Sequence, residues 1–250
     1  MKSHKPIRDK MKRIAVLSKD PILKNHIPDT NWFSHENLKQ MLDSYKTIYI
    51  KPNKGNSGNK IIRIKSVEGR YEVSFGGTRQ LASMDTLKME LDIICSTRKY
   101  FIQEGIDLAT FKGRPFDMRV VMQKPYNSWQ LTLTSAKVAT KKNAAVTNVS
   151  KGAEDFLLQK ILCNYDQKKD PMATFREIVD IAHQISYSLS NKFPLRIIGL
   201  DLAIDKNNKV WFIEANTVPL CKQCKKVNDK SSQRKYVKAK KVIRESLETF

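Results

Sequence analysis

The sequence predicts an α+β protein of two lobes, because strand-like and helix-like segments are mixed along the whole chain. Three antiparallel strand candidates follow one another in residues 47–75, separated by turns rich in Gly and Asn. A long helical pattern begins at Pro171, with apolar residues every three or four positions. Two apolar strands then flank the pair Asn207 and Asn208. A hydrophobic fraction of 40% over 250 residues suffices for packed cores.

The first part of the chain predicts a helix, a connector and a small lobe. Apolar residues recur at helical spacing in residues 1–20, which predicts a basic amphipathic helix, and a connector follows at 21–31. Ser34 has the pattern of a helix N-cap, and Ser83 opens a second helix that ends near residue 97. The predicted divisions are 1–30 for the basic helix and connector and 31–104 for the small lobe.

The second lobe is predicted to span residues 105–220. It begins with two strands, 116–124 and 128–140, which are followed by a polar stretch and then the long helix. Pro171 follows Asp170, an N-cap residue type, and proline suits the first turn of a helix. Strands 195–205 and 209–216 complete the lobe, and residues 221–250 form a basic C-terminal segment with a helix at about 232–249.

The formal net charge of +21 is concentrated at the two ends of the chain. Residues 1–24 carry +6 and residues 221–250 carry +7, which suits either contact with a polyanion or solvated helix faces. No apolar run is long enough for a signal peptide or a membrane span, so we expect a cytoplasmic protein. Four cysteines are too few for a disulfide framework, and the pair Cys221 and Cys224 is weak evidence for zinc or redox chemistry.

The apolar hairpin near the C-terminus predicts a metal site. A two-residue turn at Asn207 and Asn208 places Asp201 directly opposite Glu214, with Asn216 on the same face. Facing carboxylates repel unless a proton or cation lies between them, and such oxygen ligands suit Mg²⁺ or Mn²⁺ rather than zinc. The alternative is that both carboxylates are simply exposed to solvent. Because the neighbouring residues are apolar on both strands, we favour the metal site.

A loop in IKPNKGNSGNKI (50–61) has the composition of a phosphate-binding loop. Lys51 ends a strand, and Gly55, Ser57 and Gly58 follow it, so that backbone N–H groups can approach phosphate oxygens. The order of residues is not that of a Walker A loop. A hairpin turn that needs glycines is an equally good interpretation of this segment alone.

Arg119 lies in a strand, FDMRVVM (116–122), on the same face as Asp117 and Val121. An arginine there suits neutralisation of a phosphoryl group or a substrate carboxylate, with Asp117 orienting it, and a structural salt bridge is the alternative. In the polar stretch, Asn148 and Ser150 are of the types that approach phosphates in such loops.

Taken in order, these motifs resemble the ATP-grasp superfamily. The set comprises Lys51 with its Gly loop, FIQEGI (101–106), the DMR strand, NVSKG (148–152), GLD (199–201) and IEAN (213–216). The nearest resemblance is to the endospore coat-associated YheC/YheD-like family, and it covers about residues 8–220. It implies the ATP-grasp fold, in which ATP lies between two α+β lobes.

The resemblance implies a role for each matching position. Lys51 corresponds to the residue that contacts the α- and β-phosphates, and Gly55, Ser57 and Gly58 correspond to the flap that covers them. Gln103, Glu104 and Ile106 correspond to the residues that hold adenine and ribose. Arg119, Lys137 and Asn148 correspond to the residues that face the γ-phosphate and the acyl group. Asp201, Glu214 and Asn216 correspond to the ligands of one or two Mg²⁺ ions.

The implied reaction is that of an ATP-dependent carboxylate–amine ligase acting through an acylphosphate, with a link to spore coat formation. Such catalysis depends on positioning and charge neutralisation, so no Ser–His or Cys–His pair is needed. A different interpretation is a non-catalytic coat or assembly protein that keeps the fold and binds a polyanion or coat component through its basic ends. The sequence does not identify the carboxylate or the nucleophile.

Overall fold

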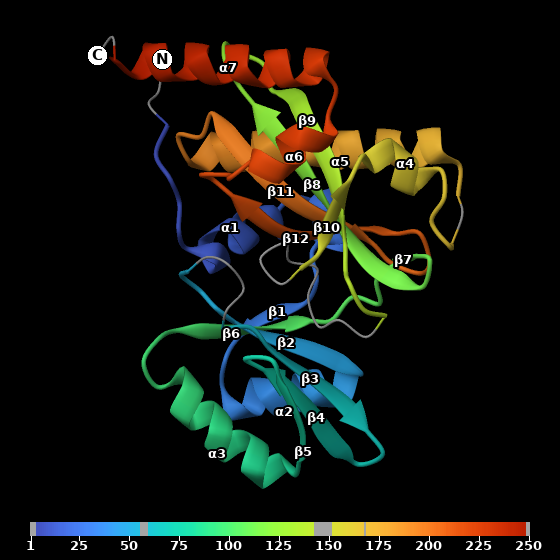
Figure 1. Ribbon diagram of the computed structural model, residues 1–250. Helices are drawn as coiled ribbons and strands as arrows, with labels where there is room; N and C mark the ends of the chain where they lie inside the picture. The colour runs from blue at the N-terminus through green and yellow to red at the C-terminus, as the bar shows by residue number, and fades with distance from the viewer. Residues whose placement is uncertain (1–3, 56–59, 143–151, 168, 249–250) are drawn as a thin grey trace. The chain divides into compact units, whose positions relative to one another are not determined.

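The computed structural model describes residues 4–55, 60–142, 152–167 and 169–248. The chain forms two compact units, each with its own sheet (Figure 1). The smaller unit comprises Pro28–Asp107. The larger unit combines the N-terminal Met1–Ile27 with Leu108–Phe250, so the two ends of the chain belong to the same unit.

The smaller unit is an antiparallel sheet covered by two helices. Its strands are β1 (Thr30–Trp32), β2 (Thr47–Pro52), β3 (Ile62–Val67), β4 (Arg70–Phe75), β5 (Thr78–Ala82) and β6 (Tyr100–Glu104), in the order β1-β6-β2-β3-β4-β5. Its helices are α2 (His35–Ser44) and α3 (Met84–Cys95). Leu38 of α2 and Leu87 of α3 pack with Ile48, Ile50 and Ile64 of the sheet in one buried core. Burial of this apolar surface is the main favourable contribution to the unit's stability.

The start of each of these helices is set by a local cap that the sequence predicts. The Ser34 hydroxyl accepts a hydrogen bond from Asn37 N, and the Ser83 hydroxyl accepts one from Thr86 N. Each bond satisfies one of the backbone donors that a helix N-terminus leaves without a partner. Both predicted caps are therefore confirmed.

The larger unit is built from a second set of strands together with helices from both ends of the chain. Its strands are β7 (Thr110–Phe111), β8 (Arg114–Gln123), β9 (Gln130–Val138), β10 (Glu154–Phe156), β11 (Ile197–Ile204) and β12 (Val210–Asn216). Its helices are α1 (Lys10–Leu17), the 3-10 helix η1 (Leu23–His26), α4 (Leu158–Leu162), α5 (Pro171–Lys192), α6 (Lys222–Val227) and α7 (Lys230–Glu248). The predicted start of α5 is confirmed, because Asp170 accepts hydrogen bonds from Met172 N and Ala173 N and proline occupies the first turn.

The sheet of the larger unit runs in the antiparallel order β10-β9-β8-β11-β12, with β7 paired to β8. Helix α5 contacts β8 and β11, helix α6 contacts β9 and β10, and helix α7 contacts β8 and β9 (Figure 1). Val121 and Leu133 on this covered face pack with Cys221, Cys224 and Tyr236. No helix among the described residues has the length and apolar character needed to cross a membrane.

The N-terminal helix is shorter than the prediction of a helix over residues 1–20. Helix α1 begins after its cap at Asp9, which accepts a hydrogen bond from Lys12 N, and ends at Leu17. Ile7, counted in the predicted stripe, lies before the helix and donates its backbone N–H to Thr217 Oγ1 at 3.0 Å. A tertiary hydrogen bond therefore overrides the helical spacing of the first residues.

The hairpin between β11 and β12 pairs Asp201 with Glu214 as predicted, but its loop differs from the predicted one. The loop contains three residues, Lys206 to Asn208, because Asp205 N donates to Lys209 O at 3.0 Å. Asn208 has a φ of 66°, as expected for the left-handed residue that closes such a loop. The prediction of a two-residue turn is wrong. A register shift between Asp201 and Leu202 compensates for it and restores the pairing of Asp201 with Glu214.

Asp205 holds this loop together, and its replacement tests the loop's contribution to stability. Its carboxylate accepts hydrogen bonds from Asn207 N, Lys209 N and Trp211 Nε1 at 2.8, 2.9 and 2.9 Å. We expect Asp205→Ala to lower the free energy of unfolding by about 2–3 kcal/mol, because three donors lose their partner. Urea unfolding measures this change. Lys206→Ala, an exposed control in the same loop, is expected to change it by less than about 0.5 kcal/mol, and equal losses in the two variants would contradict the assignment.

Candidate functional site

Strand register brings five charged residues of four neighbouring strands together on one face of the sheet of the larger unit. Lys137 of β9 is paired with Asp117 of β8, and Arg119 of β8 is paired with Asp201 of β11. Asp201 is in turn paired with Glu214 of β12. Directly paired residues project to the same side of a sheet, and so do residues two positions apart on one strand, such as Asp117 and Arg119, so these side chains share one face. We call these five residues the charged row.

Asp201 is the centre of this row. Its Oδ1 accepts hydrogen bonds from Arg119 Nε at 2.7 Å and Lys137 Nζ at 3.1 Å, and its Oδ2 accepts one from Arg119 Nη2 at 3.0 Å. Burial alone would raise the pKa of the Asp201 carboxyl, but the two neighbouring cations outweigh burial and lower that pKa below its ordinary value of 3.8. The carboxylate is therefore ionised at neutral pH.

Lys137 joins two carboxylates. Its Nζ lies 2.6 Å from Asp117 Oδ1 and 3.1 Å from Asp201 Oδ1. Burial opposes its charge, but Asp117 and Asp201 outweigh burial and raise the pKa of the ammonium group. The expectation that Asp117 orients Arg119 needs correction, since the hydrogen bonds of Arg119 go to Asp201 and the close partner of Asp117 is Lys137.

Glu214, opposite Asp201, is more open than the rest of the row, with 39% of its side chain exposed. Its Oε1 lies 3.6 Å from Lys10 Nζ and 3.9 Å from Arg13 Nη2. These distances are those of loose ion pairs, so the carboxylate retains acceptor capacity. Sequence reasoning misses the two cations of α1 here, because about 200 residues separate them from Glu214 along the chain.

The predicted metal ligands fit a hard divalent cation by their chemistry. Asp201 and Glu214 offer carboxylate oxygens, and Asn216 offers an amide oxygen that already accepts a hydrogen bond from Val218 N at 2.9 Å. Among the described residues no group of three or more His, Cys, Asp and Glu side chains is suited to a metal. The repulsion between the facing carboxylates is relieved by four cations: Arg119, Lys137, Lys10 and Arg13.

Gly199 is needed at its place beside the charged row. A Cβ there would lie 2.6 Å from Pro219 Cβ and 3.1 Å from Arg119 Nη1. Only glycine leaves room for the loop after β12 to pass over this part of β11. The glycine of the GLD motif therefore has a packing role next to Arg119.

The smaller unit brings together two of the predicted nucleotide-binding residues. Lys51 Nζ donates a hydrogen bond to Gln103 Oε1 at 2.6 Å, and Gln103 Nε2 donates to Thr30 Oγ1 at 3.1 Å. Glu104 is held at the strand end, where its backbone N donates to Asp29 O. Ile106 follows two residues later and is half-buried. Gln103 is only 1% exposed, so its amide can hold the orientation of the Lys51 side chain.

Of the predicted loop residues Gly55, Ser57 and Gly58, the structure describes Gly55. This residue has a φ of 129°, and a Cβ at this position would meet no other atom within 4 Å. Its backbone conformation rather than close packing therefore requires glycine. The predicted residues Ser57, Gly58 and Asn148 lie outside the described residues.

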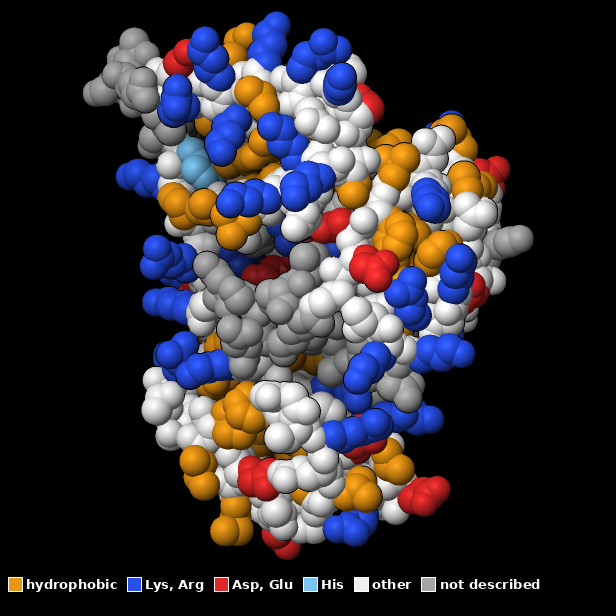
Figure 2. All heavy atoms as spheres, viewed as in Figure 1, with side chains coloured by type: hydrophobic (Ala, Val, Ile, Leu, Met, Phe, Trp, Pro, Cys, Tyr) orange, Lys and Arg blue, Asp and Glu red, His pale blue; other side chains and the backbone are white. Residues whose placement is uncertain are grey.

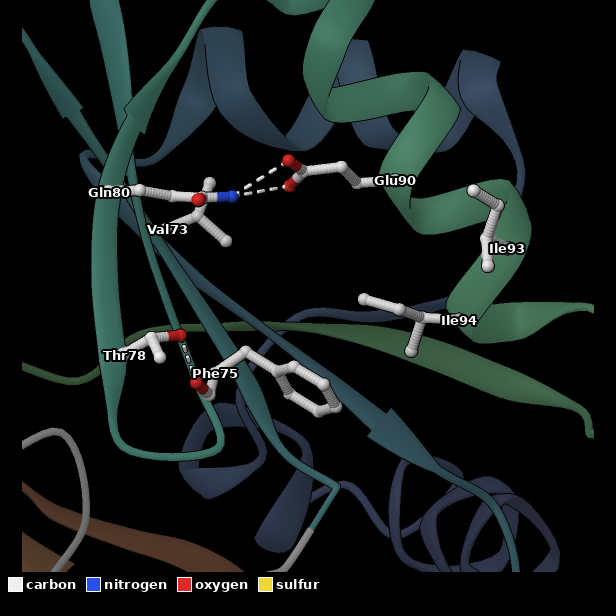
Figure 3. Close-up of a pocket in the computed structure, with 7 residues that line it drawn as sticks. All are labelled: Val73, Phe75, Thr78, Gln80, Glu90, Ile93 and Ile94. Atoms are coloured by element: carbon white, nitrogen blue, oxygen red, sulfur yellow. Dashed lines mark hydrogen bonds between the residues drawn. The ribbon is translucent and has the colours of Figure 1, made fainter.

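A separate cavity of about 240 Å³ lies in the smaller unit, between α3 and the strands β4 and β5 (Figure 3). Val73, Phe75, Ile93 and Ile94 give it an apolar lining. At one side Gln80 Nε2 donates hydrogen bonds to both carboxylate oxygens of Glu90, at 2.7 and 2.8 Å. The predicted site residues do not line this cavity, so it is distinct from the charged row and from the Lys51–Gln103 pair.

Cys221 and Cys224 are buried thiols beneath α7. Burial raises the pKa of both, that of Cys224 to about 12. A thiol is a poor nucleophile and a poor zinc ligand until it loses its proton. Packing against Tyr236 is therefore the role that the structure supports for this pair.

Comparison with solved structures identifies the fold as ATP-grasp. The ligase PsnB, in a structure with a precursor variant, Mg and ADP, superposes with a TM-score of 0.56 at 12% identity over 94% of this chain and 58% of that one. The D-alanine–D-alanine ligase of Coxiella burnetii gives a TM-score of 0.52 at 13% identity, over 85% and 48% of the two chains. The predicted α+β, ATP-grasp fold is confirmed.

The chain belongs to the YheC/D-like ATP-grasp family, whose pattern it matches over residues 2–241. It is 28% identical over 214 residues to the endospore coat-associated protein YheD of Bacillus subtilis (strain 168). The aligned region covers 82% of this chain and 46% of YheD. The endospore coat-associated protein YheC of the same strain is 22% identical over 235 residues, and the aligned region covers 91% of this chain and 64% of YheC. The chain thus spans less than two thirds of the length of either relative.

The charged row predicts how stability depends on pH. The folded-state pKa of Asp201 is lowered, so its stabilising contribution is present above the ordinary value of 3.8 and is lost as the pH falls further. We expect Asp201→Asn to be less stable than the parent by about 3 kcal/mol at pH 7, since it leaves two buried cations short of a partner. We also expect its stability to fall less steeply below about pH 4.

Urea unfolding at about pH 7, 5, 4 and 3 measures both effects. Asp180→Asn, an exposed carboxylate on α5, serves as the control and should retain the parent's pH dependence. Parallel curves for Asp201→Asn and the parent chain would show that Asp201 carries no lowered pKa.

Proposed function

We propose that this chain binds Mg-ATP and phosphorylates a carboxylate, so that an amine can then form an amide with it. The observation that supports the proposal most is the charged row, in which cations and carboxylates converge on one face of the sheet. Fixed cations of this kind stabilise the charge that develops on a transferring phosphoryl group without rearrangement of solvent. The fold of known ATP-grasp ligases supports the same class of reaction.

In the proposed reaction a carboxylate oxygen of the substrate attacks the γ-phosphorus of ATP. The bond from that phosphorus to the bridging oxygen breaks, its electron pair leaves with ADP, and an acylphosphate results. An amine then attacks the acyl carbon, inorganic phosphate leaves with the electron pair of the carbon–oxygen bond, and the amine loses a proton to solvent. Arg119 and Lys137 hold positive charge beside the reacting oxygens throughout both steps.

Asp201, Glu214 and Asn216 would hold one or two Mg²⁺ ions, or Mn²⁺, which would neutralise charge on the phosphates when bound. The Asp201 carboxylate is fixed by Arg119 and Lys137, so it presents its remaining lone pair, on Oδ2, in a set direction. Asn148 would add a contact to the γ-phosphate.

For the smaller unit, we propose that Lys51 and Gln103 contact a nucleotide. Gly55, Ser57 and Gly58 would cover its phosphates, and Glu104 and Ile106 would hold its base and ribose. The hydrogen bond from Lys51 to Gln103 supports this, because it keeps the ammonium group at the strand end before any ligand binds.

Calorimetric titration tests nucleotide binding. We expect Mg-ATP to bind the parent chain, and Glu214→Gln to weaken binding by about tenfold or more, because a metal ligand loses its charge. Asp180→Asn on α5 is the matched control and should bind like the parent. Failure of Mg-ATP to bind, together with unchanged thermal stability in its presence, would refute the proposal.

The acceptor is sought by measuring ADP release with amino acids, peptides and cell-wall precursors in turn. Release that depends on one carboxylate and one amine would identify both substrates. The curated relatives are named endospore coat-associated proteins, so we propose that the reaction takes place in the cytoplasm of a spore-forming bacterium and serves the spore coat.

A second candidate function, binding of a linear polyanion by a non-catalytic coat or assembly protein, is favoured by the surface of α7. Tyr236, Ala239 and Ile243 bury one side of this helix. The described part of the helix exposes seven cations: Lys230, Arg234, Lys235, Lys238, Lys240, Lys241 and Arg244. Figure 2 shows Lys and Arg side chains gathered over this region. Tyr236 is buried and so is not available to stack on bases, which points to recognition of repeated negative charge.

Binding to long duplex DNA and to polyglutamate at increasing salt tests this second function. Replacing Lys230, Arg234, Lys238 and Lys241 by Ala should reduce the slope of log affinity against log salt by about 3.6 units for DNA, since each phosphate neutralised by a cation contributes about 0.9. The control replaces four exposed cations of the smaller unit, Lys39, Lys46, Arg98 and Lys99, and so removes the same charge. Equal losses in both variants would refute a binding surface on α7.

A further inference from the structure

The segment before α1 is anchored to the chain directly after β12. His4 Nε2 lies 2.8 Å from Thr217 O, and Ile7 N donates to Thr217 Oγ1 at 3.0 Å. On the other side, Lys5 N donates to Pro194 O at 2.8 Å. These bonds join residues about 190 to 210 positions apart within the larger unit, so the N-terminal segment has a defined place beside the end of β12.

Helix α1 continues from this anchor and contacts both α5 and β12. Its apolar residues Ile14 and Leu17 are buried. Lys10 and Arg13 are three positions apart and therefore neighbours on one side of the helix, which is turned toward Glu214. Their side chains are only 13% and 5% exposed, which is unusual for residues that normally extend into water.

The charge of the candidate site depends on these two residues. Without them the row contains three carboxylates, Asp117, Asp201 and Glu214, and two cations, Arg119 and Lys137, so its formal charge is −1. Lys10 and Arg13 change that formal charge to +1. Such a change matters because interactions between charges are strong where water is largely excluded.

We propose that Lys10 and Arg13 are positioning residues of this site: they hold Glu214 in place and give the site the net positive charge that attracts an anionic nucleotide. This inference rests on the proposed function, since it assumes that the charged row receives Mg-ATP. It assigns the N-terminal helix to the site, although the chain carries this helix about 190 residues before the hairpin of β11 and β12.

Opposite effects on a free cation and on a nucleotide follow from this role. The two residues repel a divalent cation that approaches Glu214 alone, and they attract Mg-ATP, which carries net negative charge. A residue that only stabilised the fold would, when lost, weaken both kinds of binding together. The sign of the two changes therefore separates an electrostatic role from a structural one.

The experiment compares Lys10→Ala with the parent chain by two titrations. Binding of Mn²⁺ alone is followed by electron paramagnetic resonance, and binding of Mg-ATP by calorimetry. We expect Lys10→Ala to bind Mn²⁺ about threefold to tenfold more tightly and Mg-ATP about threefold to tenfold more weakly. Changes of this size are expected because the variant loses one positive charge that lies near the site and is partly screened by solvent. Lys10→Arg keeps the charge and should restore both affinities.

Lys12→Ala removes an exposed lysine from the same helix and is the matched control, with both affinities expected to equal the parent's. Arg13→Lys, which keeps the buried charge, checks that the effect follows charge rather than loss of packing. If the parent binds Mg-ATP but Lys10→Ala changes both affinities in the same direction, or neither, the inference about α1 is wrong. If the parent does not bind Mg-ATP, the proposed function itself fails.

Discussion

The buried carboxylate of Asp201, held by Arg119 and Lys137, is the interaction on which the larger unit's organisation depends. Three hydrogen bonds satisfy it, and they come from two strands that are separate from its own. Charges of this kind are costly to remove from water and remain tolerable only when their partners are placed accurately. The register of β8, β9 and β11 is therefore tied to one electrostatic arrangement.

The same sheet also has an apolar region, and the two parts support each other. Val121 and Leu133 are covered by Cys221, Cys224 and Tyr236, so water is kept from one flank of the charged residues. Low exposure strengthens the interactions among the four less exposed members of the row, which suits a site that stabilises charge on a phosphoryl group. Rigid strands rather than loops carry the residues of the row, and this keeps their geometry fixed.

Local features are predictable from this sequence, and long-range features are not. The caps at Ser34, Ser83 and Asp170 depend on a few neighbouring residues, and all three occur as expected. The sequence pattern misses the short strands β1 and β5, because their positions are set by pairing with β6 and β4 rather than by their own composition. Strand alternation places Asp117 near Arg119, but it does not show that Lys137 from β9 competes for that carboxylate. The sequence predicts a basic helix near the N-terminus, but it does not show that Lys10 and Arg13 of this helix lie beside Glu214.

The hairpin of β11 and β12 has the predicted pairing of Asp201 with Glu214, but its loop length and its strand register differ from the prediction. One extra residue in the loop and one in the bulge near Ile213 cancel, so Asp201 still faces Glu214. A change in either place alone would turn one carboxylate to the opposite side of the sheet. Insertions and deletions in this hairpin should therefore be tolerated during evolution only as matched pairs, and relatives that differ in loop length should also differ in the bulge.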